Sequence, residues 1–243
     1  MANLLILDAS SSLCSVTLLN GEQRHDLSET QPRRHAQRLL PMVDEVLQLA
    51  GLPKAELDGI AYARGPGSFT GIRIAVSVVQ GIAMGLDIPV YGFSTLQMLA
   101  QQSAASLGGQ PDRIVSILDA HMGEVFWGVY QRQDNGIWAL VGDEHVGAPD
   151  VCAAALAEAF GSEPESNWCL AGNGVKLLPE SMPLPTQCAR LEDIEPLCGF
   201  ATAPVQAAWQ QQLFGELDQY PPVYLRDSVA WKKLDEQPSL LKR

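Results

Sequence analysis

Charged side chains are scarce in this sequence of 243 residues, where they make up 18% of the total, and basic ones are the scarcer kind. So little charge beside 47% hydrophobic residues excludes an intrinsically disordered chain. The 16 Lys and Arg residues face 28 Asp and Glu residues, which leaves a formal net charge of −12. Because basic side chains supply most of the affinity for a phosphate backbone, we expect the chain to reach any nucleic acid only through a basic partner.

Paired cysteines and long apolar runs are also missing. The five cysteines are odd in number and form no C-x-x-C pair, which favours reduced thiols in the cytoplasm over a disulfide framework or a zinc site. The first apolar run, residues 4–7, is broken by Asp8 before it reaches the length of a signal peptide. No run approaches the ~20 apolar residues of a membrane span. We therefore predict a cytoplasmic protein with no membrane role.

Hydrophobic periodicity predicts two copies of one α/β unit. The first copy is predicted to contain strands at residues 4–7, 14–19, 23–27, 60–63 and 88–91 and helices at residues 34–50, 70–85 and 94–108. The second copy is predicted to contain strands at residues 114–118, 125–130 and 168–171, another strand after the turn Asn135-Gly136, and helices near residues 150–160 and 195–214. Asp8-Ala9 and Asp119-Ala120 are the equivalent points of the two copies.

This order of elements predicts the fold class. It is α/β, a duplicated RNase H-like fold of the kind found in actin-like ATPases, with two mixed-sheet subdomains. We expect residues 1–108 to form the N-terminal subdomain, which carries the glycine-rich motif described next. Residues 109–243 are expected to form the C-terminal subdomain, with its tail packing back on the first.

A glycine-rich turn joins the strand at residues 60–63 to the helix that follows. Its motif residues are Gly65, Gly67, Ser68, Thr70, Gly71 and Arg73. A phosphate-binding P-loop would need a glycine in place of Thr70 and a lysine after it, so that interpretation fails. A nucleophile elbow around Ser68 would need glycines where Pro66 and Thr70 stand. We interpret the motif as a tight turn in which Gly67 allows the chain to reverse and Ser68 or Thr70 caps the helix.

Five other stretches join this motif in one ordered pattern. They are residues 5–8, 34–41, 119–125, 222–226 and 229–233. Together with Arg64-Gly65-Pro66-Gly67-Ser68-Phe69-Thr70-Gly71-Ile72-Arg73, this pattern resembles the TsaB (YeaZ) family over the length of the chain.

The resemblance implies a non-catalytic scaffold subunit that acts with the catalytic subunit TsaD and the small ATPase TsaE. This complex would transfer a threonylcarbamoyl group to N6 of adenosine 37 in tRNAs that read codons beginning with A. The resemblance also implies a homodimer when the chain is alone, and contact with tRNA only through the complex.

The metal ligands of the catalytic relative are replaced here. TsaD carries a His-x-x-x-His pair just after its third parallel strand, and the resemblance puts Gly92 and Leu96 at these positions. Neither side chain has a lone pair to donate to a metal. The four histidines of the chain lie at least ten positions apart. We therefore expect no catalytic residue and no bound metal.

An autonomous ATP-binding kinase or transferase of the actin-like superfamily is the alternative function. Such folds hold ATP between two Asp-containing hairpins and a glycine turn, and the matching residues here are Asp8, Ser10, Asp119, Gly172 and Gly174. Ala9 and Ser10 stand where these kinases usually place a glycine, so their Cβ atoms crowd the approach of phosphates to the backbone. We interpret the cleft as a vestigial nucleotide site and expect no required cofactor. Weak nucleotide binding is the alternative.

The helix at residues 70–85 is apolar nearly all round, since its polar residues Arg73, Ser77 and Gln80 form one narrow stripe. A helix that covers one sheet needs only one apolar face, so the remainder indicates a second contact. Helices of the same chain or a partner helix both satisfy this pattern, and the resemblance to TsaB favours the partner. The predicted partner interface comprises Leu39, Met42, Val43, Val46, Ile72, Ala75, Val79 and Ile82. Small residues such as Gly81 and Gly85 would let the partner approach closely.

Overall fold

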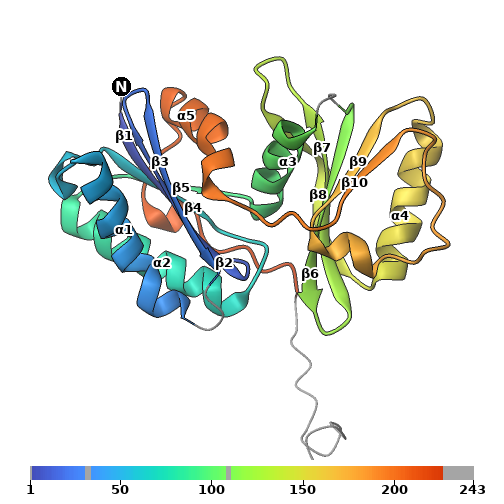
Figure 1. The fold of residues 1–243 in the computed structure, drawn as a ribbon, viewed down its shortest axis with the longest axis horizontal. Helices are drawn as coiled ribbons and strands as arrows, with labels where there is room; N and C mark the ends of the chain where they lie inside the picture. The colour runs from blue at the N-terminus through green and yellow to red at the C-terminus, as the bar shows by residue number, and fades with distance from the viewer. Residues whose placement is uncertain (1, 31–33, 108–110, 227–243) are drawn as a thin grey trace, which may run out of the picture.

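The computed structural model describes residues 2–30, 34–107 and 111–226, and its helices and sheets alternate in five layers (Figure 1). The first sheet contains β1 (Asn3–Asp8), β2 (Leu13–Asn20), β3 (Gln23–Thr30), β4 (Gly59–Ala63) and β5 (Val90–Phe93). The second contains β6 (Arg113–His121), β7 (Glu124–Arg132), β8 (Trp138–Gly147), β9 (Trp168–Ala171) and β10 (Cys188–Leu191). The α-helices are α1 (His35–Ala50), α2 (Phe69–Leu86), α3 (Thr95–Ser106), α4 (Pro149–Ser162) and α5 (Thr202–Gln210). Short 3-10 turns are η1 (Lys54–Glu56), η2 (Asn173–Leu177), η3 (Cys198–Phe200) and η4 (Leu217–Gln219).

The two sheets repeat one topology. Their strand orders are β3-β2-β1-β4-β5 and β8-β7-β6-β9-β10. In the first sheet β1 is antiparallel to β2 and parallel to β4, and in the second β6 is antiparallel to β7 and parallel to β9. This arrangement confirms the predicted α/β class with a duplicated RNase H-like unit. The sequence prediction missed β10, because this strand has four residues and no alternation of buried and exposed positions.

The central strands β1 and β4 of the first sheet are buried on both faces. Leu5 and Leu7 of β1 pack in the cluster formed with α1 and α2, whereas Leu4 and Ile6 pack in the cluster formed with α5. Successive strand residues point to opposite faces, so one apolar run serves two layers. In the same way, α4 covers the outer face of the second sheet while α3 covers its inner face. Helices α3 and α5 thus lie between the two sheets (Figure 1).

The helices between the sheets cross the predicted subdomain boundary at residue 108. Helix α3 belongs to the first half, yet Leu99 packs with Ile114 of the second sheet. Helix α5 belongs to the second half, yet Val205 packs with Leu4 and Ile6 of the first sheet. The helix predicted near residues 195–214 is therefore shorter than expected and completes the first unit rather than the second. An amphipathic pattern reveals that a helix has an apolar face, but it does not reveal which sheet that face will cover.

A buried polar cluster fixes α3 to the second sheet. The hydroxyl groups of Ser94, which caps α3, and of Tyr130 on β7 both donate to Oε1 of Glu144 on β8. Burial raises the pKa of the Glu144 carboxyl. Because all three groups satisfy one another, the cluster holds the helix in a defined position.

The last described residues bridge the two halves. Gly215 forms an isolated bridge with Val90, and the Tyr62 hydroxyl donates to the carbonyl oxygen of Tyr220. Arg226 then pairs with Glu124 of the second half. The segment before residue 227 therefore ties both subdomains together.

Asp8 is a buried carboxylate at the end of the central strand β1. Its side chain has no exposed surface, and only Oδ1 has a hydrogen-bond donor, the backbone N–H of Ser10 at 2.8 Å. Burial raises the pKa of Asp8 to about 6, against the hydrogen bonds from Ser10, which lower it.

We predict that Asp8 makes the fold less stable as the pH rises. The folded-state pKa is about 6 and the unfolded value is about 3.9, so the folded chain binds the extra proton between these limits. The free energy of unfolding should fall by about 1 kcal/mol more in the natural chain than in Asp8→Asn between pH 5 and pH 7.5. Urea unfolding at both pH values measures this. Asp134→Asn in an exposed turn is the control, and equal pH dependence in natural chain and Asp8→Asn would contradict the assignment.

Candidate partner-binding site

The glycine-rich turn packs directly on the first Asp-containing hairpin. A Cβ atom on Gly71 would lie 1.8 Å from the carbonyl oxygen of Ala9, and one on Gly67 would lie 2.5 Å from that of Ser10. The N–H of Ser68 donates to the same Ser10 oxygen at 2.7 Å. Only glycine permits these two approaches, so the motif fixes the start of α2 against β1.

The other motif residues have separate places in this turn. Ser68 caps α2 by accepting a hydrogen bond from the N–H of Gly71, which confirms the capping role that the sequence left shared with Thr70. Thr70 lies in the first turn of the helix and is exposed. Gly65 has φ of +115°, and a Cβ there would lie 2.7 Å from the carbonyl oxygen of Val223. Arg73 stacks its guanidinium over Phe69, 3.8 Å from the ring centre.

The second half contains an equivalent glycine turn. A Cβ on Gly172 would lie 2.1 Å from the carbonyl oxygen of Ile117, and one on Gly174 would lie 2.8 Å from the carbonyl carbon of Leu118. The N–H of Asp119 donates to the side-chain oxygen of Asn173 at 2.9 Å. Here, however, the turn continues only into η2, whereas the first glycine turn begins the 18 residues of α2. A long helix directly after the glycine turn is therefore found in the first half and not at the equivalent place in the second.

These contacts engage backbone groups of the predicted nucleotide cleft. Ser10 contacts the first glycine turn and Asp119 contacts the second, while Oδ1 of Asp8 accepts a hydrogen bond from the N–H of Ser10. The N–H groups of Ser10 and Asp119 are therefore engaged within the chain. A cavity of about 710 Å³ does open between the halves, next to Ser12, Gln102 and residues 190–195. None of the five predicted cleft residues lines it.

Gly92 and Leu96, where the resemblance led us to expect the metal ligands of TsaD, both lie in packed surroundings. A Cβ on Gly92 would lie 2.8 Å from Cβ of Tyr220, and Leu96 is fully buried against the second sheet. Within residues 2–30, 34–107 and 111–226, no three His, Cys, Asp or Glu side chains gather in a way that suits a metal ion.

The residues predicted to form the partner interface are mostly core residues, so that prediction is wrong in detail. Seven of them have at most 1% of their surface exposed: Leu39, Met42, Val43, Val46, Ile72, Ala75 and Val79. The eighth, Ile82, is partly buried against the same core. The buried side chains Ile72, Ala75 and Val79 of α2 recur with helical spacing and form the face that packs on the sheet. A charge at Ala75 or Val79 would disrupt the folded chain itself.

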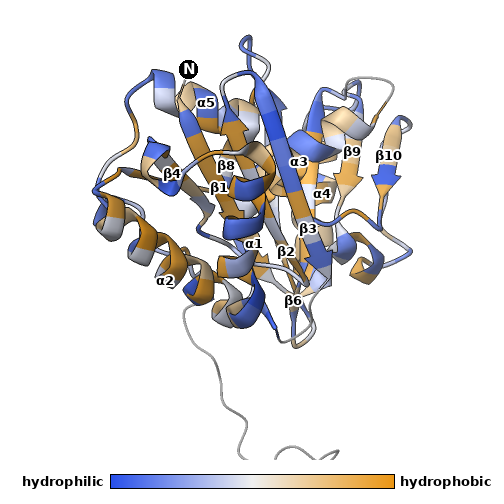
Figure 2. Cartoon of the chain, turned by 60° about the vertical axis from the view of Figure 1, so that its left-hand side comes forward, coloured by the Kyte–Doolittle hydropathy of each residue, from blue (hydrophilic) through white to orange (hydrophobic). Residues whose placement is uncertain are grey.

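The outer side of α2 nevertheless stays apolar. Ile74, Val78, Gly81 and Gly85 form one ridge along the helix, and Cβ atoms on either glycine would meet nothing within 4 Å. Met84 and Phe69 flank the ridge with 76% and 51% of their surface exposed. Figure 2 shows the orange of hydrophobic residues along the visible side of α2. We call Leu40 of α1 together with these six α2 residues the docking face.

Helix α2 is long and apolar enough to cross a membrane by length and composition, yet only 28% of it is buried. Its inner side is part of the core with β1 and β4. The helix is thus integrated in the fold, and its exposed apolar side distinguishes it from an ordinary core helix.

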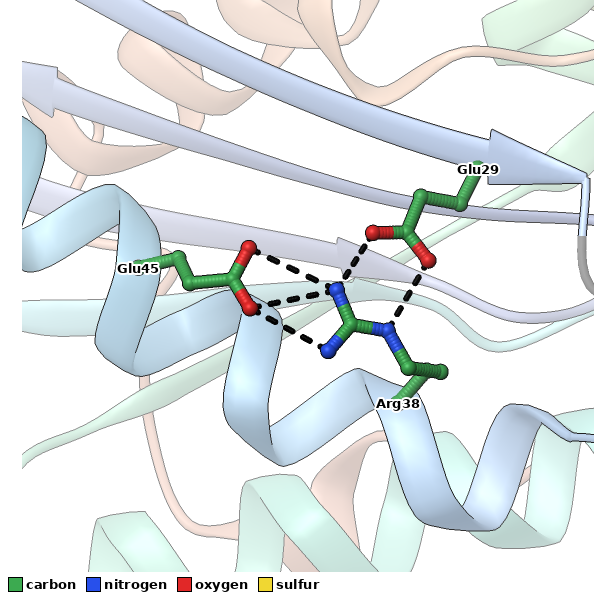
Figure 3. A network of polar contacts seen from close by, with 3 residues as sticks. All are labelled: Glu29, Arg38 and Glu45. Atoms are coloured by element: carbon green, nitrogen blue, oxygen red, sulfur yellow. Dashed lines mark hydrogen bonds and ion pairs between the residues drawn. The ribbon is translucent and has the colours of Figure 1, made fainter.

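Helix α1, which lies beside α2, is joined to strand β3 by a charged network. Nε of Arg38 donates to Glu29 of β3 at 2.9 Å, and Nη1 donates to Glu45 of α1 at 3.1 Å (Figure 3). One guanidinium between two carboxylates joins the helix to the edge strand. Arg38 therefore has a structural role within the stretch 34–41.

Comparison with known proteins gives the family. A family model described as TsaD: tRNA N6-adenosine threonylcarbamoyltransferase matches residues 29–233. The tRNA threonylcarbamoyladenosine biosynthesis protein TsaB of Escherichia coli (strain K12) is 37% identical over 235 residues, which cover 95% of this chain and 97% of that protein. The TsaB protein of Haemophilus influenzae is 34% identical, with 95% and 96% covered.

A solved structure shows the same architecture. YeaZ from Pseudomonas aeruginosa matches with a TM-score of 0.78 and 37% identity, and the match covers 93% of this chain and 100% of that one. Sequence and structure thus agree over nearly the whole length. The chain belongs to the TsaB (YeaZ) family of tRNA threonylcarbamoyladenosine biosynthesis proteins.

Proposed function

We propose that the chain is a non-catalytic scaffold subunit, which pairs through its docking face with the catalytic subunit TsaD and works with the ATPase TsaE. The observation that carries this proposal is the outer ridge of α2, an apolar and open surface on a helix that is otherwise part of the core. In this complex the threonylcarbamoyl group reaches N6 of adenosine 37 of tRNA, in tRNAs that read codons beginning with A.

The ridge suits a helix as its partner. Gly81 and Gly85 lie one turn apart, and the space above them is open, so a second helix axis can come close. The flanking side chains of Phe69 and Met84 would then lose their exposed apolar surface, which favours association. The same ridge pairs two copies of the chain when the partner is absent, so homodimer and heterodimer exclude each other.

The non-catalytic role is supported by contacts within the predicted cleft. The glycine turns engage the hairpin backbone at Ser10 and Asp119, and Tyr220 packs where a metal-binding side chain would begin at Gly92. With a net charge of −12, the chain contacts tRNA through its partners rather than alone. All five cysteines are free thiols, which suits a cytoplasmic location.

We predict that Gly81→Arg weakens pairing with TsaD at least thirty-fold while the folded chain becomes no less stable. Arginine is a better helix former than glycine by roughly 0.5–1 kcal/mol, and its Cβ meets nothing within 4 Å in the chain. In the complex it would stand in the path of the partner helix and cost about 2 kcal/mol or more, roughly a thirty-fold loss of affinity. Light scattering with purified TsaD measures pairing, and thermal unfolding measures stability.

Gln80→Arg is the matched control, since it adds the same side chain one residue away and off the ridge. It should retain most of the affinity. If Gly81→Arg pairs as tightly as the control, the ridge of α2 is not the contact surface.

We also predict that ATP with Mg²⁺, titrated into about 0.1 mM of the isolated chain, gives no saturable heat of binding. The reason is that the hairpin backbone groups of the chain already form hydrogen bonds within it. Calorimetry measures this. Binding of one equivalent with turnover, lost in Asp8→Ala or Asp119→Ala, would favour the alternative of an ATP-dependent kinase or transferase.

A further inference from the structure

A groove lies between the N-terminal ends of α1 and α2. It has a volume of about 510 Å³, and its apolar walls include Ala36, Phe69, Ile74 and Val78. Two hydroxyl groups, those of Thr70 and Ser77, also line it. This combination suits an aromatic side chain that has one polar atom, because the ring is buried while the polar atom finds a hydrogen bond.

The chain itself passes the mouth of this groove. The ring of Tyr224 lies 5.1 Å from the ring of Phe69, which lines the groove, and Nε of Arg73 donates to the Tyr224 hydroxyl at 3.3 Å. Two residues later Arg226 donates to the carbonyl oxygen of Ala120 at 3.3 Å. The part of the chain that follows Arg226 therefore begins close to the groove.

Seventeen residues, 227–243, follow the described structure. They span roughly 25 Å as a helix and over twice that when extended, so they are long enough to reach the groove and to run along α2. The segment contains the apolar residues Ala230, Trp231 and Leu234.

Trp231 is the residue in this segment that fits the groove. The other tryptophans have core positions: Trp127, Trp138 and Trp168 are buried, and Trp209 packs against Phe214. Trp231 comes five positions after Arg226, and such a short tether gives an effective concentration in the millimolar range. A large aromatic side chain is also the type that most often dominates the affinity of a contact.

We propose that the C-terminal segment of the chain, residues 227–243, docks in this groove with Trp231 as its anchor. Because Ile74 and Val78 belong to both the groove and the docking face, the segment covers part of that face until a partner displaces it. This displacement rests on the proposed function, whereas the docking of the segment does not.

Disulfide trapping in the full-length chain tests the proposal. Ala230→Cys is combined with Ser77→Cys, which lines the groove, or with Gln80→Cys, which is exposed on the same helix outside it. Under oxidised glutathione we expect the first pair to form an intrachain disulfide at least ten-fold faster than the second. Adding Trp231→Glu should remove this difference. Mass spectrometry separates intrachain from interchain products, and circular dichroism confirms that each variant is folded.

Equal trapping rates for the two pairs would overturn the proposal, and so would a rate unchanged by Trp231→Glu. A predominantly interchain product would identify a second copy as the occupant and would also overturn it. No partner protein is present in this assay, so its failure differs from a failure of pairing with TsaD. In a second arm with excess TsaD, the trapping rate should fall at least five-fold, and an unchanged rate would contradict only the displacement by the partner.

Discussion

The missing Cβ of Gly71 is the constraint on which the rest of the structure depends. It allows the first turn of α2 to touch the carbonyl oxygen of Ala9, where any other residue would clash at 1.8 Å. Gly67 makes the same kind of contact with Ser10, and the hairpin that could hold phosphate becomes a support for a helix. This close approach positions α2 on the first Asp-containing hairpin.

The position of α2 explains why one side of the helix is buried and the opposite side is exposed. The inner side of α2 is buried against the sheet through Ile72, Ala75 and Val79. Helix α1 covers one neighbouring side of α2. On the outer ridge, Ile74 and Val78 are partly buried, whereas Gly81 and Gly85 have no such cover within the described residues. In the second half the equivalent turn ends in η2, so the described part of that half has no counterpart of α2. An exposed apolar ridge on a helix that is otherwise part of the core is typical of a surface that binds another protein.

The sequence predicted the duplicated fold well, because strand periodicity and turn residues are local signals. It did not predict that α3 and α5 exchange sheets, since Leu99 and Val205 have the same pattern whichever sheet they cover. The capping role of Ser68 was predictable from the turn chemistry. The interface residues were not, because Ala75 and Val79 mark the apolar face that the sheet takes, and only the three-dimensional arrangement shows which side of α2 remains.

The central claim is that the outer side of α2 meets the partner, and hydroxyl-radical footprinting of two methionines tests it most directly. Met84 on α2 and Met122 in the β6–β7 hairpin are comparably exposed, with 76% and 68% of their surface open, so each serves as the reference for the other. Relative to the chain alone at a concentration low enough to keep it monomeric, saturating TsaD should lower the oxidation rate of Met84 several-fold while that of Met122 stays the same. Protection of Met122 with Met84 still reactive would contradict the account.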